Sequence, residues 1–490
     1  MNQLKQSEYA DRVAKLEALR AMGIDPYPAK TNRNIMIGSV LSNFKGLESS
    51  KKEIILAGRL RSLRGHGNLS FSDLEDNSGK IQLVISKKEV GPESYKLFEK
   101  FTDVGDFIEV KGTAFTTQAG QESLMVTEWR FLTKALRPLP DKWHGLEDKE
   151  EKLRKRYLDI LTDADLKDMI FKRARFWNSM REFLIKRDFL EVETPVLETT
   201  TGGADARPFV THHNALDIDV YLRISAGELW QKRLMVAGFD KTFEIGRQFR
   251  NEGMSNEHLQ DYTQMEFYWG YADYEKGMEL VTELYRYIAK ETFNKLKFTI
   301  NNFEVDLGCD WEIYDFTSII KEKTGVDITK TDLKEIEITL KKLKIDYDKK
   351  GFNITRGIDN LWKYCRKSLA GPGFLINVPV VMEPLAKRQV SNPNFVQRFQ
   401  VIIAGSELGK GYSELNDPID QAGRFANQQE LREAGDDEAQ MFDKDFVEAL
   451  EYGMPPTCGF GISERLFSFL YDKPIRECQI FPLLRKKDDK

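Results

Sequence analysis

Hydrophobic residues recur with two different periods along the chain, and the change of period separates predicted helices from predicted strands. The first segment, 5–22, predicts an amphipathic helix that ends before Gly23 and the proline-bearing turn at 26–28. Its apolar residues fall at roughly helical spacing: Leu4, Tyr9, Val13, Leu16 and Leu19. The chain therefore begins with a short helical extension.

From about 53 to 134, five short runs alternate apolar and polar residues, and they predict five strands. Glycine-bearing turns at 65–67, 77–79 and 119–120 separate the runs, and a helical interruption lies near 95–101. This order predicts a small Greek-key barrel of the kind that binds oligonucleotides on its open face. A five-stranded barrel with a purely structural role would give the same pattern.

A segment with two prolines near 135–150 predicts a linker, and helices follow it, the longer one at 164–188. A strand stopped by Pro195, a glycine-bearing loop and a helix with Glu228 near its start come next. Residues from about 300 to 375 show a mixed pattern, which we interpret as an insertion without a catalytic constellation. The last third returns to strand-like runs and contains a glycine-rich strand-to-helix turn.

The stretch 242–269 carries more charge than an ordinary pair of core strands would. Both of its ends alternate as strands do, and a polar loop joins them, so the pattern predicts an antiparallel pair with a long loop. If the polar faces line one cavity, four side chains could hold an anionic group beside a cationic group: Arg250, Glu252, Glu266 and Tyr268. A zwitterion or a phosphate ester with an amine would suit such a cavity. A sheet face exposed to water, with scattered ion pairs, also fits the alternation.

The composition of the 490 residues is ordinary, with 41% hydrophobic and 31% charged residues. No run of about 18 apolar residues suggests a membrane span, and the N-terminus lacks the apolar core of a signal peptide, so we expect a cytoplasmic protein without a membrane partner. The net charge of −5 argues against DNA as a partner but leaves room for RNA held by a local basic surface. Four widely spaced cysteines indicate neither a disulfide framework nor a zinc site.

Three motifs follow one another along the chain. A long helix and the strand ended by Pro195 come first, then Phe249-Arg250-Asn251-Glu252, then a Gly-Phe-Gly-Ile-Ser-Glu-Arg run that ends at Arg465. This order resembles motifs one, two and three of the class II aminoacyl-tRNA synthetases. Longer strings such as TGGADARPFVTHHNALDIDVYLRIS, EIGRQFRNEG, GYSELNDPIDQA and EYGMPPTCGFGI look like those of the bacterial lysyl-tRNA synthetases. The similarity covers nearly the whole chain except about 300–370.

The resemblance implies an α+β protein, in which an N-terminal OB-fold β-barrel precedes a class II catalytic domain with a central antiparallel sheet flanked by helices. The expected parts are a helical extension at 1–50, the anticodon-binding barrel at 51–136, a linker at 137–160 and the catalytic domain at 161–490, with the insertion at about 300–370. The implied reaction activates L-lysine with ATP to lysyl-adenylate and pyrophosphate and transfers lysine to the 3′ end of its tRNA. Motif one is expected to form the two-fold interface of a homodimer.

The resemblance also assigns the ATP-binding residues. Arg250 matches the motif-two arginine that holds the α-phosphate and the lysine carboxylate, and Arg250 and Arg465 are the expected catalytic residues. Glu252 matches the residue that accepts from the adenine amino group, Tyr262 is placed to stack on the base, and His258 lies in the loop that closes over ATP. Arg465 would stack on the other face of adenine and reach the γ-phosphate.

Specificity for lysine requires a buried carboxylate, because an ammonium ion is costly to desolvate without a partner. The expected substrate-binding residues are Gly203, Glu228, Arg250, Glu266, Tyr268, Tyr412 and Glu414. Among them, Glu228, Glu414 and Tyr268 correspond to the family's side-chain contacts, and Glu266 and Gly203 lie nearer the α-amino group. Such an acidic pocket separates this chain from aspartyl and asparaginyl relatives, whose pockets would favour Arg or Lys.

Glu407 matches a ligand of the magnesium ions that bind with ATP, and oxygen ligands suit Mg²⁺. The second expected ligand, seven residues earlier, is Gln400, whose neutral carbonyl would bind the ion more weakly than a carboxylate. Lys410 replaces an asparagine of the family, which puts a cation near the expected substrate carboxylate unless the side chain points away. These differences leave the reaction class unchanged and concern the number of metal ions and the affinity for lysine.

In the barrel, Phe71 and Gln82 lie eleven residues apart on the second and third strands. They match the residues with which relatives stack on the middle anticodon uridine and pair with it, as proteins commonly read RNA loops. Arg59, Arg64 and Glu122 are further candidates for phosphate and first-base contacts. A surface ion pair is the alternative for each of these three.

Two other functions fit parts of the sequence. Gln400 and Lys410 would also suit a non-catalytic RNA-binding or regulatory paralogue that kept the fold and lost the activity. Within enzymes, the alternative is a relative that ligates another amino acid to tRNA or to a protein lysine. The complete anticodon-binding barrel argues against the protein-modifying option.

Overall fold

A computed structural model describes the chain at residues 3–140, 148–204, 206–349, 352–435 and 439–486. Its internal contacts divide the chain into two compact units, Met1–Thr162 and Asp163–Lys490. The predicted linker 137–160 lies partly outside the described residues, at 141–147. Among the described residues, no helix is both long enough and apolar enough to cross a membrane.

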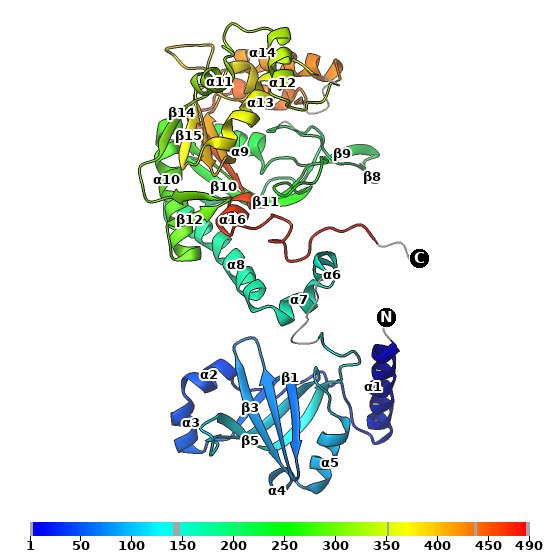
Figure 1. Ribbon diagram of the computed structural model, residues 1–490. Helices are drawn as coiled ribbons and strands as arrows, with labels where there is room; N and C mark the ends of the chain where they lie inside the picture. The colour runs from blue at the N-terminus through cyan, green and yellow to red at the C-terminus, as the bar shows by residue number, and fades with distance from the viewer. Residues whose placement is uncertain (1–2, 141–147, 205, 350–351, 436–438, 487–490) are drawn as a thin grey trace. The chain divides into compact units, whose positions relative to one another are not determined.

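The first unit is built on a closed barrel whose strands follow the order β1-β2-β3-β5-β4 (Figure 1). These strands are β1 (Ile54–His66), β2 (Leu69–Glu75), β3 (Lys80–Ser86), β4 (Phe107–Thr116) and β5 (Glu122–Thr133). The helices are α1 (Gln3–Ala21), α2 (Ile37–Ser42), α3 (Phe44–Ser50), α4 (Lys87–Val90), α5 (Pro92–Phe101), α6 (Lys149–Arg154) and α7 (Arg156–Thr162). The predicted barrel and its helical interruption, which includes α5, are confirmed.

Alternation along the strands separates the barrel's interior from its outer surface. In β2, Ser70, Ser72 and Leu74 are buried, and the residues between them are partly exposed. Strands β4 and β5 approach closely at Gly112, where a Cβ atom would lie 2.1 Å from the carbonyl oxygen of Met125. The partly exposed positions of β2, which include Phe71, face outward and are available to a ligand.

The second unit is built on an eight-stranded sheet with the order β14-β15-β16-β17-β18-β11-β10-β6. Its strands are β6 (Leu190–Glu191), β10 (Lys241–Phe249), β11 (Asp261–Gly270), β14 (Glu312–Asp315), β15 (Gly373–Ile376), β16 (Arg398–Ile403), β17 (Ser406–Ser413) and β18 (Thr457–Ser463). The five central pairings are antiparallel, and the two edge pairings, β14 with β15 and β6 with β10, are parallel. The predicted antiparallel core of an α+β catalytic domain is confirmed.

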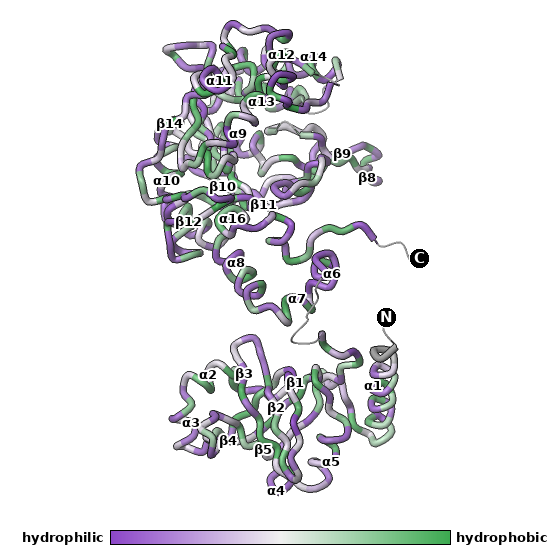
Figure 2. The backbone as a smooth tube through the Cα atoms, viewed as in Figure 1, coloured by the Kyte–Doolittle hydropathy of each residue, from purple (hydrophilic) through white to green (hydrophobic). Residues whose placement is uncertain are grey.

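Helices and two small sheets surround this central sheet (Figure 1). The small sheets are β7 (Leu197–Glu198) with β8 (Val210–His213) and β9 (Ile218–Leu222), and β12 (Lys297–Ile300) with β13 (Phe303–Asp306). The helices are α8 (Ala164–Ile185), α9 (Glu228–Val236), α10 (Tyr274–Phe293), α11 (Phe316–Thr324), α12 (Leu333–Lys342), α13 (Ile354–Cys365), α14 (Pro418–Glu433), α15 (Lys444–Glu451) and α16 (Arg465–Leu470), with 3₁₀ turns at η1 (Arg366–Ser368) and η2 (Val380–Met382). Figure 2 shows hydrophobic and hydrophilic residues interleaved along α8, as expected for a helix with one face on a core.

The charged stretch 242–269 forms the predicted antiparallel pair, β10 with β11, in an unbroken register from Lys241–Trp269 to Phe249–Asp261. The middle of its polar face is buried. The side chains of Glu244, Gln248 and Glu266 belong to residues that are only 4%, 0% and 4% exposed. The alternative of a sheet face exposed to water is therefore wrong for the middle of this stretch, whereas Arg247 and Asp261 on the opposite face form an ion pair with side chains 42% and 45% exposed.

Strand alternation sends aromatic residues to one face of the central sheet and polar residues to the other. Phe267 and Phe460 pack together with ring centroids 5.6 Å apart, and Tyr285 of α10 packs edge-on against Phe460. Glu266 and Tyr268, the neighbours of Phe267, therefore point to the opposite face. The packing of α10 thus fixes which side of the sheet can hold a polar site.

Candidate functional site

A cavity of about 570 Å³ lies on the polar face of the sheet. Every residue predicted for the ATP, lysine and magnesium sites lines it: Gly203, Glu228, Arg250, Glu252, His258, Tyr262, Glu266, Tyr268, Gln400, Glu407, Tyr412, Glu414 and Arg465. These residues come from three central strands, β11, β16 and β17, from α9 and α16, and from the loops beside them. The fold thus joins segments that lie more than two hundred residues apart in the sequence.

Two glycines let the carboxylates at one end of the cavity pack closely against the backbone. A Cβ atom on Gly459 would lie 2.1 Å from Glu414 Oε1 and 2.7 Å from an edge carbon of Tyr268. Gly203 has a φ of +87°, and a Cβ atom there would lie 3.0 Å from Glu228 Oε2. The carboxylates of Glu414 and Glu228 therefore occupy places that a side chain at Gly459 or Gly203 would fill.

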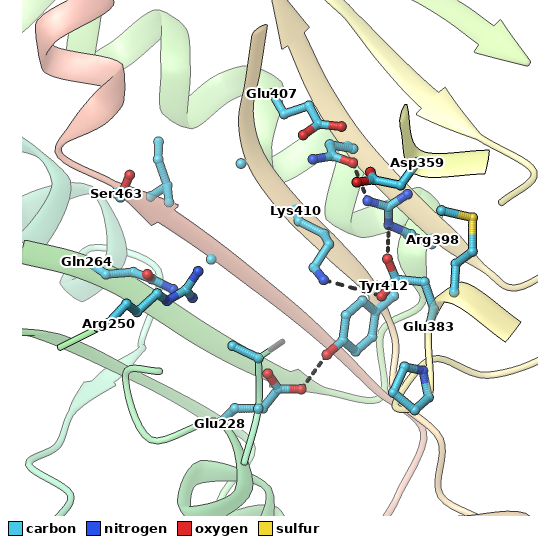
Figure 3. Close-up of a pocket in the computed structure, with 18 of the residues that line it drawn as sticks. Glu228, Arg250, Gln264, Asp359, Glu383, Arg398, Glu407, Lys410, Tyr412 and Ser463 are labelled. Atoms are coloured by element: carbon cyan, nitrogen blue, oxygen red, sulfur yellow. Dashed lines mark hydrogen bonds and ion pairs between the residues drawn. The ribbon is translucent and has the colours of Figure 1, made fainter. Parts of the chain in front are cut away.

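Three buried carboxylates meet at this end: Glu228, Glu266 and Glu414, which are 5%, 4% and 1% exposed. Glu266 Oε1 accepts hydrogen bonds from the backbone N–H of Ala226 at 2.8 Å and from the side-chain amide of Gln264 at 2.7 Å, and Glu266 Oε2 accepts from the Tyr268 hydroxyl at 3.1 Å. The Tyr412 hydroxyl donates to Glu228 Oε1 (Figure 3). The carboxylates are therefore held in fixed orientations.

Lys232 contacts two of these carboxylates, and the sequence analysis did not single it out. Its Nζ lies 2.7 Å from Glu228 Oε1 and 2.6 Å from Glu414 Oε2, and its side chain is 1% exposed. Glu228 and Lys232 lie four residues apart on α9, so helical spacing alone could have predicted their contact. The contact with Glu414 depends on the position of β17 and could not have been predicted in this way.

Burial and mutual repulsion perturb the carboxyl groups at this end. Burial and the charge of Glu228 raise the pKa of Glu266 to about 7. Burial raises the pKa of Glu414 to about 8, with Lys232 opposing the shift and Glu228 adding to it. This end of the cavity therefore exchanges protons near neutral pH, and an arriving ammonium group would favour the ionised carboxylates.

Two arginine side chains line the cavity beyond the carboxylates, Arg250 in the middle (Figure 3) and Arg465 at the other end. Arg250 follows β10 directly, its Nε donates to the carbonyl of Ile224 at 3.2 Å, and its guanidinium lies 5.7 Å from the centre of the Tyr262 ring. Arg465 begins α16, and its Nη2 donates to Glu257 and, at 3.1 Å, to the Ser406 hydroxyl. Both guanidinium groups are thus held by fixed partners at the cavity wall.

The long loop between β10 and β11 contributes His258, whose Nδ1 lies 2.8 Å from the Ser255 hydroxyl. Burial and the nearby charge of Arg465 lower the pKa of His258, so its imidazole is neutral at neutral pH. Glu257 of the same loop pairs with Arg465, which no sequence motif indicated. A ligand with phosphate groups would compete with Glu257 for this guanidinium.

The predicted insertion also supplies part of the cavity wall. Residues from α13 and its N-terminal turn line the cavity: Asn353, Thr355, Arg356, Asp359, Trp362 and Lys363. The Trp362 indole N–H donates to Glu407 Oε1 at 2.6 Å. Burial would raise the pKa of Glu407, but nearby charges, above all Arg366, lower it, so this carboxylate is ionised. Strands β14 and β15 of the same segment also complete one edge of the sheet.

Gln400 and Lys410, which depart from the expected pattern, share a network with Glu383 (Figure 3). Arg398 donates to Gln400 Oε1, and its Nε lies 2.8 Å from Glu383 Oε1. Lys410 lines the cavity with its Nζ 3.3 Å from Glu383 Oε2. Lys410 therefore does not leave the cavity wall, and Glu383 neutralises part of its charge.

A magnesium ion fits the residues here only in part. Among the described residues, no group of three or more Asp, Glu, His or Cys side chains could hold a metal ion. Glu407 offers an ionised carboxylate, whereas the carbonyl of Gln400 already accepts from Arg398. These donors suit an ion that arrives on the phosphates of a ligand, and they do not form a complete site for a resident ion.

On the barrel, the predicted anticodon residues lie on neighbouring strands. Phe71 is opposite Val84 and Asp73 is opposite Gln82, so Phe71 and Gln82 share one outward face. Arg64 is opposite Phe71, whereas Arg59 lies opposite Glu75, four residues further along β2, with its guanidinium 4.2 Å above the Phe107 ring. Glu122 begins β5 beside Ser123, whose hydroxyl donates to Gln82 at 2.9 Å.

Comparisons with known proteins agree with both units. The model of the class II tRNA synthetases for D, K and N matches residues 148–485, and the model of the OB-fold nucleic acid binding domain matches residues 54–132. A lysine–tRNA ligase of Thermotoga maritima is 43% identical over 97% of this chain and 95% of its own length. This chain belongs to the lysine–tRNA ligase family.

Other lysine–tRNA ligases show the same extent of similarity. The protein of Thermoanaerobacter pseudethanolicus is 44% identical over 98% of this chain and 96% of its own length, and that of Roseiflexus castenholzii is 43% identical over the whole of both. The resemblance to the class II synthetases is therefore confirmed. The match to the Roseiflexus castenholzii protein extends over the whole of this chain, so its span includes residues 300–370.

Proposed function

We propose that the cavity performs both steps of lysine–tRNA ligation, the activation of L-lysine by ATP and the transfer of the lysyl group to tRNA. The observation that carries this proposal is the pairing of opposite charges within one cavity. Three buried carboxylates lie at one end, Arg465 lies at the other, and Arg250 lies between them (Figure 3). An amino acid with a cationic side chain and a nucleoside triphosphate match these two ends.

In the first step, an oxygen of the lysine carboxylate attacks the α-phosphorus of ATP, and pyrophosphate leaves. Arg250 lies between the two ends of the cavity, where it would bind the lysine carboxylate and the α-phosphate together. Its planar guanidinium suits both groups, and it would stabilise the negative charge that spreads over the phosphorus in the transition state. Holding the two reactants in line supplies much of the remaining acceleration.

The ATP contacts follow from the same placement. Glu252 and Tyr262 would recognise adenine, Tyr262 by stacking, and His258 would close over the triphosphate. Arg465 would exchange its pairing with Glu257 for the γ-phosphate, which carries more negative charge than a single carboxylate.

Magnesium would enter bound to the ATP phosphates, with Glu407 as the side chain that meets it and Gln400 as a weaker neighbour. Excess EDTA is therefore expected to stop the reaction.

The acidic end explains the choice of amino acid. Glu228 and Glu414, with Tyr268 and Tyr412, would hold the ε-ammonium group, and Glu266 would hold the α-ammonium group, with Gly203 nearby in the lining. An aspartate or asparagine substrate would leave these carboxylates without a cation, so the cavity should reject both strongly. In the second step, a hydroxyl group of the terminal ribose of tRNA attacks the lysyl-adenylate carbonyl, and AMP leaves.

The decisive experiment is ATP–pyrophosphate exchange with the purified protein, with lysine, ornithine, asparagine or aspartate as the amino acid. Exchange with lysine, and far less with the other three, is the expected result. Absence of exchange with lysine would contradict the proposal and would favour the non-catalytic paralogue. Exchange with another amino acid in preference to lysine would support the alternative that this chain ligates a different substrate.

The barrel is proposed to read the anticodon of the tRNA through Phe71 and Gln82. Phe71→Ala removes a stacking surface that is worth about 1–3 kcal/mol per base, so the KM for tRNA is expected to rise about 10- to 100-fold in the aminoacylation assay. Lysine-dependent exchange, which needs no tRNA, serves as the internal control and should not change. An unaltered KM for tRNA would remove Phe71 from the anticodon site.

A homodimer is proposed because apolar side chains remain exposed around motif one. Phe171, Leu190, Val196, Leu197 and Val210 are each more than two-fifths exposed. A patch of this kind is commonly covered by a second copy in a two-fold arrangement. Sedimentation equilibrium should give twice the chain mass, and Leu197→Asp should lower it to that of a single chain; a monomeric native protein would contradict the proposal.

The cytoplasmic location stays a prediction, which cell fractionation can test.

A further inference from the structure

We propose that Lys232 is a positioning residue for lysine specificity: its resident ammonium group holds Glu228 and Glu414 so that their remaining oxygens form a site for one further ammonium group. This inference rests on the proposed function of the cavity and extends it to a residue that does not line the cavity. Lys232 Nζ lies 2.7 Å from Glu228 Oε1 and 2.6 Å from Glu414 Oε2. Its role would be exerted through these two carboxylates, without contact with the substrate.

The geometry separates the two sides of each carboxylate. Lys232 meets Glu228 at Oε1 and Glu414 at Oε2. The other oxygens, Glu228 Oε2 and Glu414 Oε1, are the atoms packed nearest to Gly203 and Gly459. Both glutamates line the cavity and Lys232 does not, so the oxygens that the Lys232 ammonium group leaves free are the ones that a ligand in the cavity can use.

Lys232 itself is held in a site built for a cation. Its Nζ lies 5.5 Å from the centre of the Tyr412 ring and 5.8 Å from that of Phe446, which are distances of cation–π contact. Burial alone would lower the pKa of Lys232, but the charges of Glu228 and Glu414 outweigh it and raise the pKa. The buried ammonium group is therefore permanently charged and cannot be pulled into the cavity without losing both partners.

The charge balance gives this arrangement a consequence for substrate choice. When all three carboxylates carry their charge, the one resident ammonium group leaves two negative charges at this end. A lysine substrate carries two ammonium groups, and its carboxylate would be neutralised by Arg250. Without Lys232 a third negative charge would remain in a buried site, where it would be removed by taking up a proton.

The prediction concerns how lysine binding depends on pH, so the surrounding charges matter. The titratable and charged groups that face this centre from the packed elements are Glu228, Arg250, Glu266, Tyr268, Glu383, Tyr412, Glu414 and Cys458. Lysine binds to ionised carboxylates, so affinity should rise as pH increases through 7 to 8, the range of the raised pKa values of Glu266 and Glu414. Since Lys232 lowers the pKa of Glu414, removing it should move this rise to higher pH.

The experiment measures the KM for lysine and kcat in ATP–pyrophosphate exchange between pH 6.5 and 9 for the native protein, Lys232→Met and Lys232→Arg. For Lys232→Met, KM at pH 7 should rise about 100-fold or more, with a smaller change in kcat, because a buried charge pair is broken. The midpoint of the pH dependence should move upward by at least one pH unit. Lys232→Arg keeps the charge, so its midpoint should match that of the native protein, while the larger planar group should raise KM about 10-fold.

Arg233→Met is the matched control, because Arg233 is the next residue on α9 and pairs with Asp443. It should lower thermal stability and leave the pH midpoint unchanged. A folded Lys232→Met protein with the native midpoint would overturn the proposal. If Lys232→Met does not fold, Lys232→Arg decides, since an unchanged KM would show that the ammonium group does not set the spacing of the carboxylates. Absence of lysine-dependent exchange in the native protein would instead refute the proposed function itself.

Discussion

Replacing Arg250 with alanine is expected to lower kcat/KM for lysine-dependent ATP–pyrophosphate exchange by about a thousand-fold or more, which is about 4 kcal/mol of transition-state stabilisation. Arg250 lies between the acidic end and the cationic end of the cavity, and its side chain donates to the backbone at Ile224. Its removal would leave the charge on the reacting phosphate without its main counterion. The measurement is steady-state exchange with lysine as the varied substrate.

Two variants sharpen this experiment. Arg247→Ala is the matched control, since Arg247 lies on β10 three residues before Arg250 and pairs with Asp261 at a partly exposed site outside the cavity lining. It should retain nearly native exchange. Arg250→Lys keeps the charge but loses the forked geometry, and its activity should fall between those of the native protein and Arg250→Ala. Binding of tRNA should survive in Arg250→Ala, and native exchange in that variant would show the assignment of Arg250 to be wrong.

Glu414→Gln is expected to raise the KM for lysine by about 100- to 1,000-fold, because it breaks a buried charge pair and leaves Lys232 with one partner fewer. The substitution preserves shape, so the loss would come from charge. The effect of pH should also change: the component that follows the raised pKa of Glu414 should disappear from the lysine affinity profile. Measurements of KM and kcat at pH 6.5, 7.5 and 8.5 separate these two effects.

Glu448→Gln serves as the control for Glu414→Gln, because Glu448 is exposed on α15 and does not line the cavity. It should leave exchange unchanged at every pH. A KM for lysine within about two-fold of the native value in Glu414→Gln would mean that the ε-ammonium group binds elsewhere. A fall in kcat without a change in KM would place Glu414 at the reaction step instead of the binding step.

Local patterns in the sequence identified the elements that hold the site. The alternation in 242–269 gave a correct strand pair, because residues two apart on a strand must share a face. The same alternation could not decide whether the polar face meets water. Glu266 is buried because helices and loops from distant parts of the sequence cover it. The periodicity of neighbouring residues cannot predict such burial.

The resemblance to known motifs identified more of the site than periodicity did, since it named residues on three separate strands, two helices and several loops that the fold brings to one cavity. It missed the residues that support them. Trp362, from the segment interpreted as an insertion, donates a hydrogen bond to Glu407. Glu257 accepts a hydrogen bond from Arg465. These contacts join residues at least 45 positions apart in the sequence. Tertiary packing brings the partners together, so their spacing in the sequence could not predict either contact.

By itself, the sequence determined the order of the helices and strands, the division into a barrel and a catalytic unit with an antiparallel sheet, and the family to which the chain belongs. Short-range physics suffices for these, because helical and strand periods and motif spacing are properties of neighbouring residues. Only the tertiary structure decided how charge is distributed in the cavity. The contact of Lys232 with Glu228 follows from one helical turn, but its contact with Glu414 exists because the fold brings the residue that follows β17 to α9. That pair decides how many negative charges remain for the substrate.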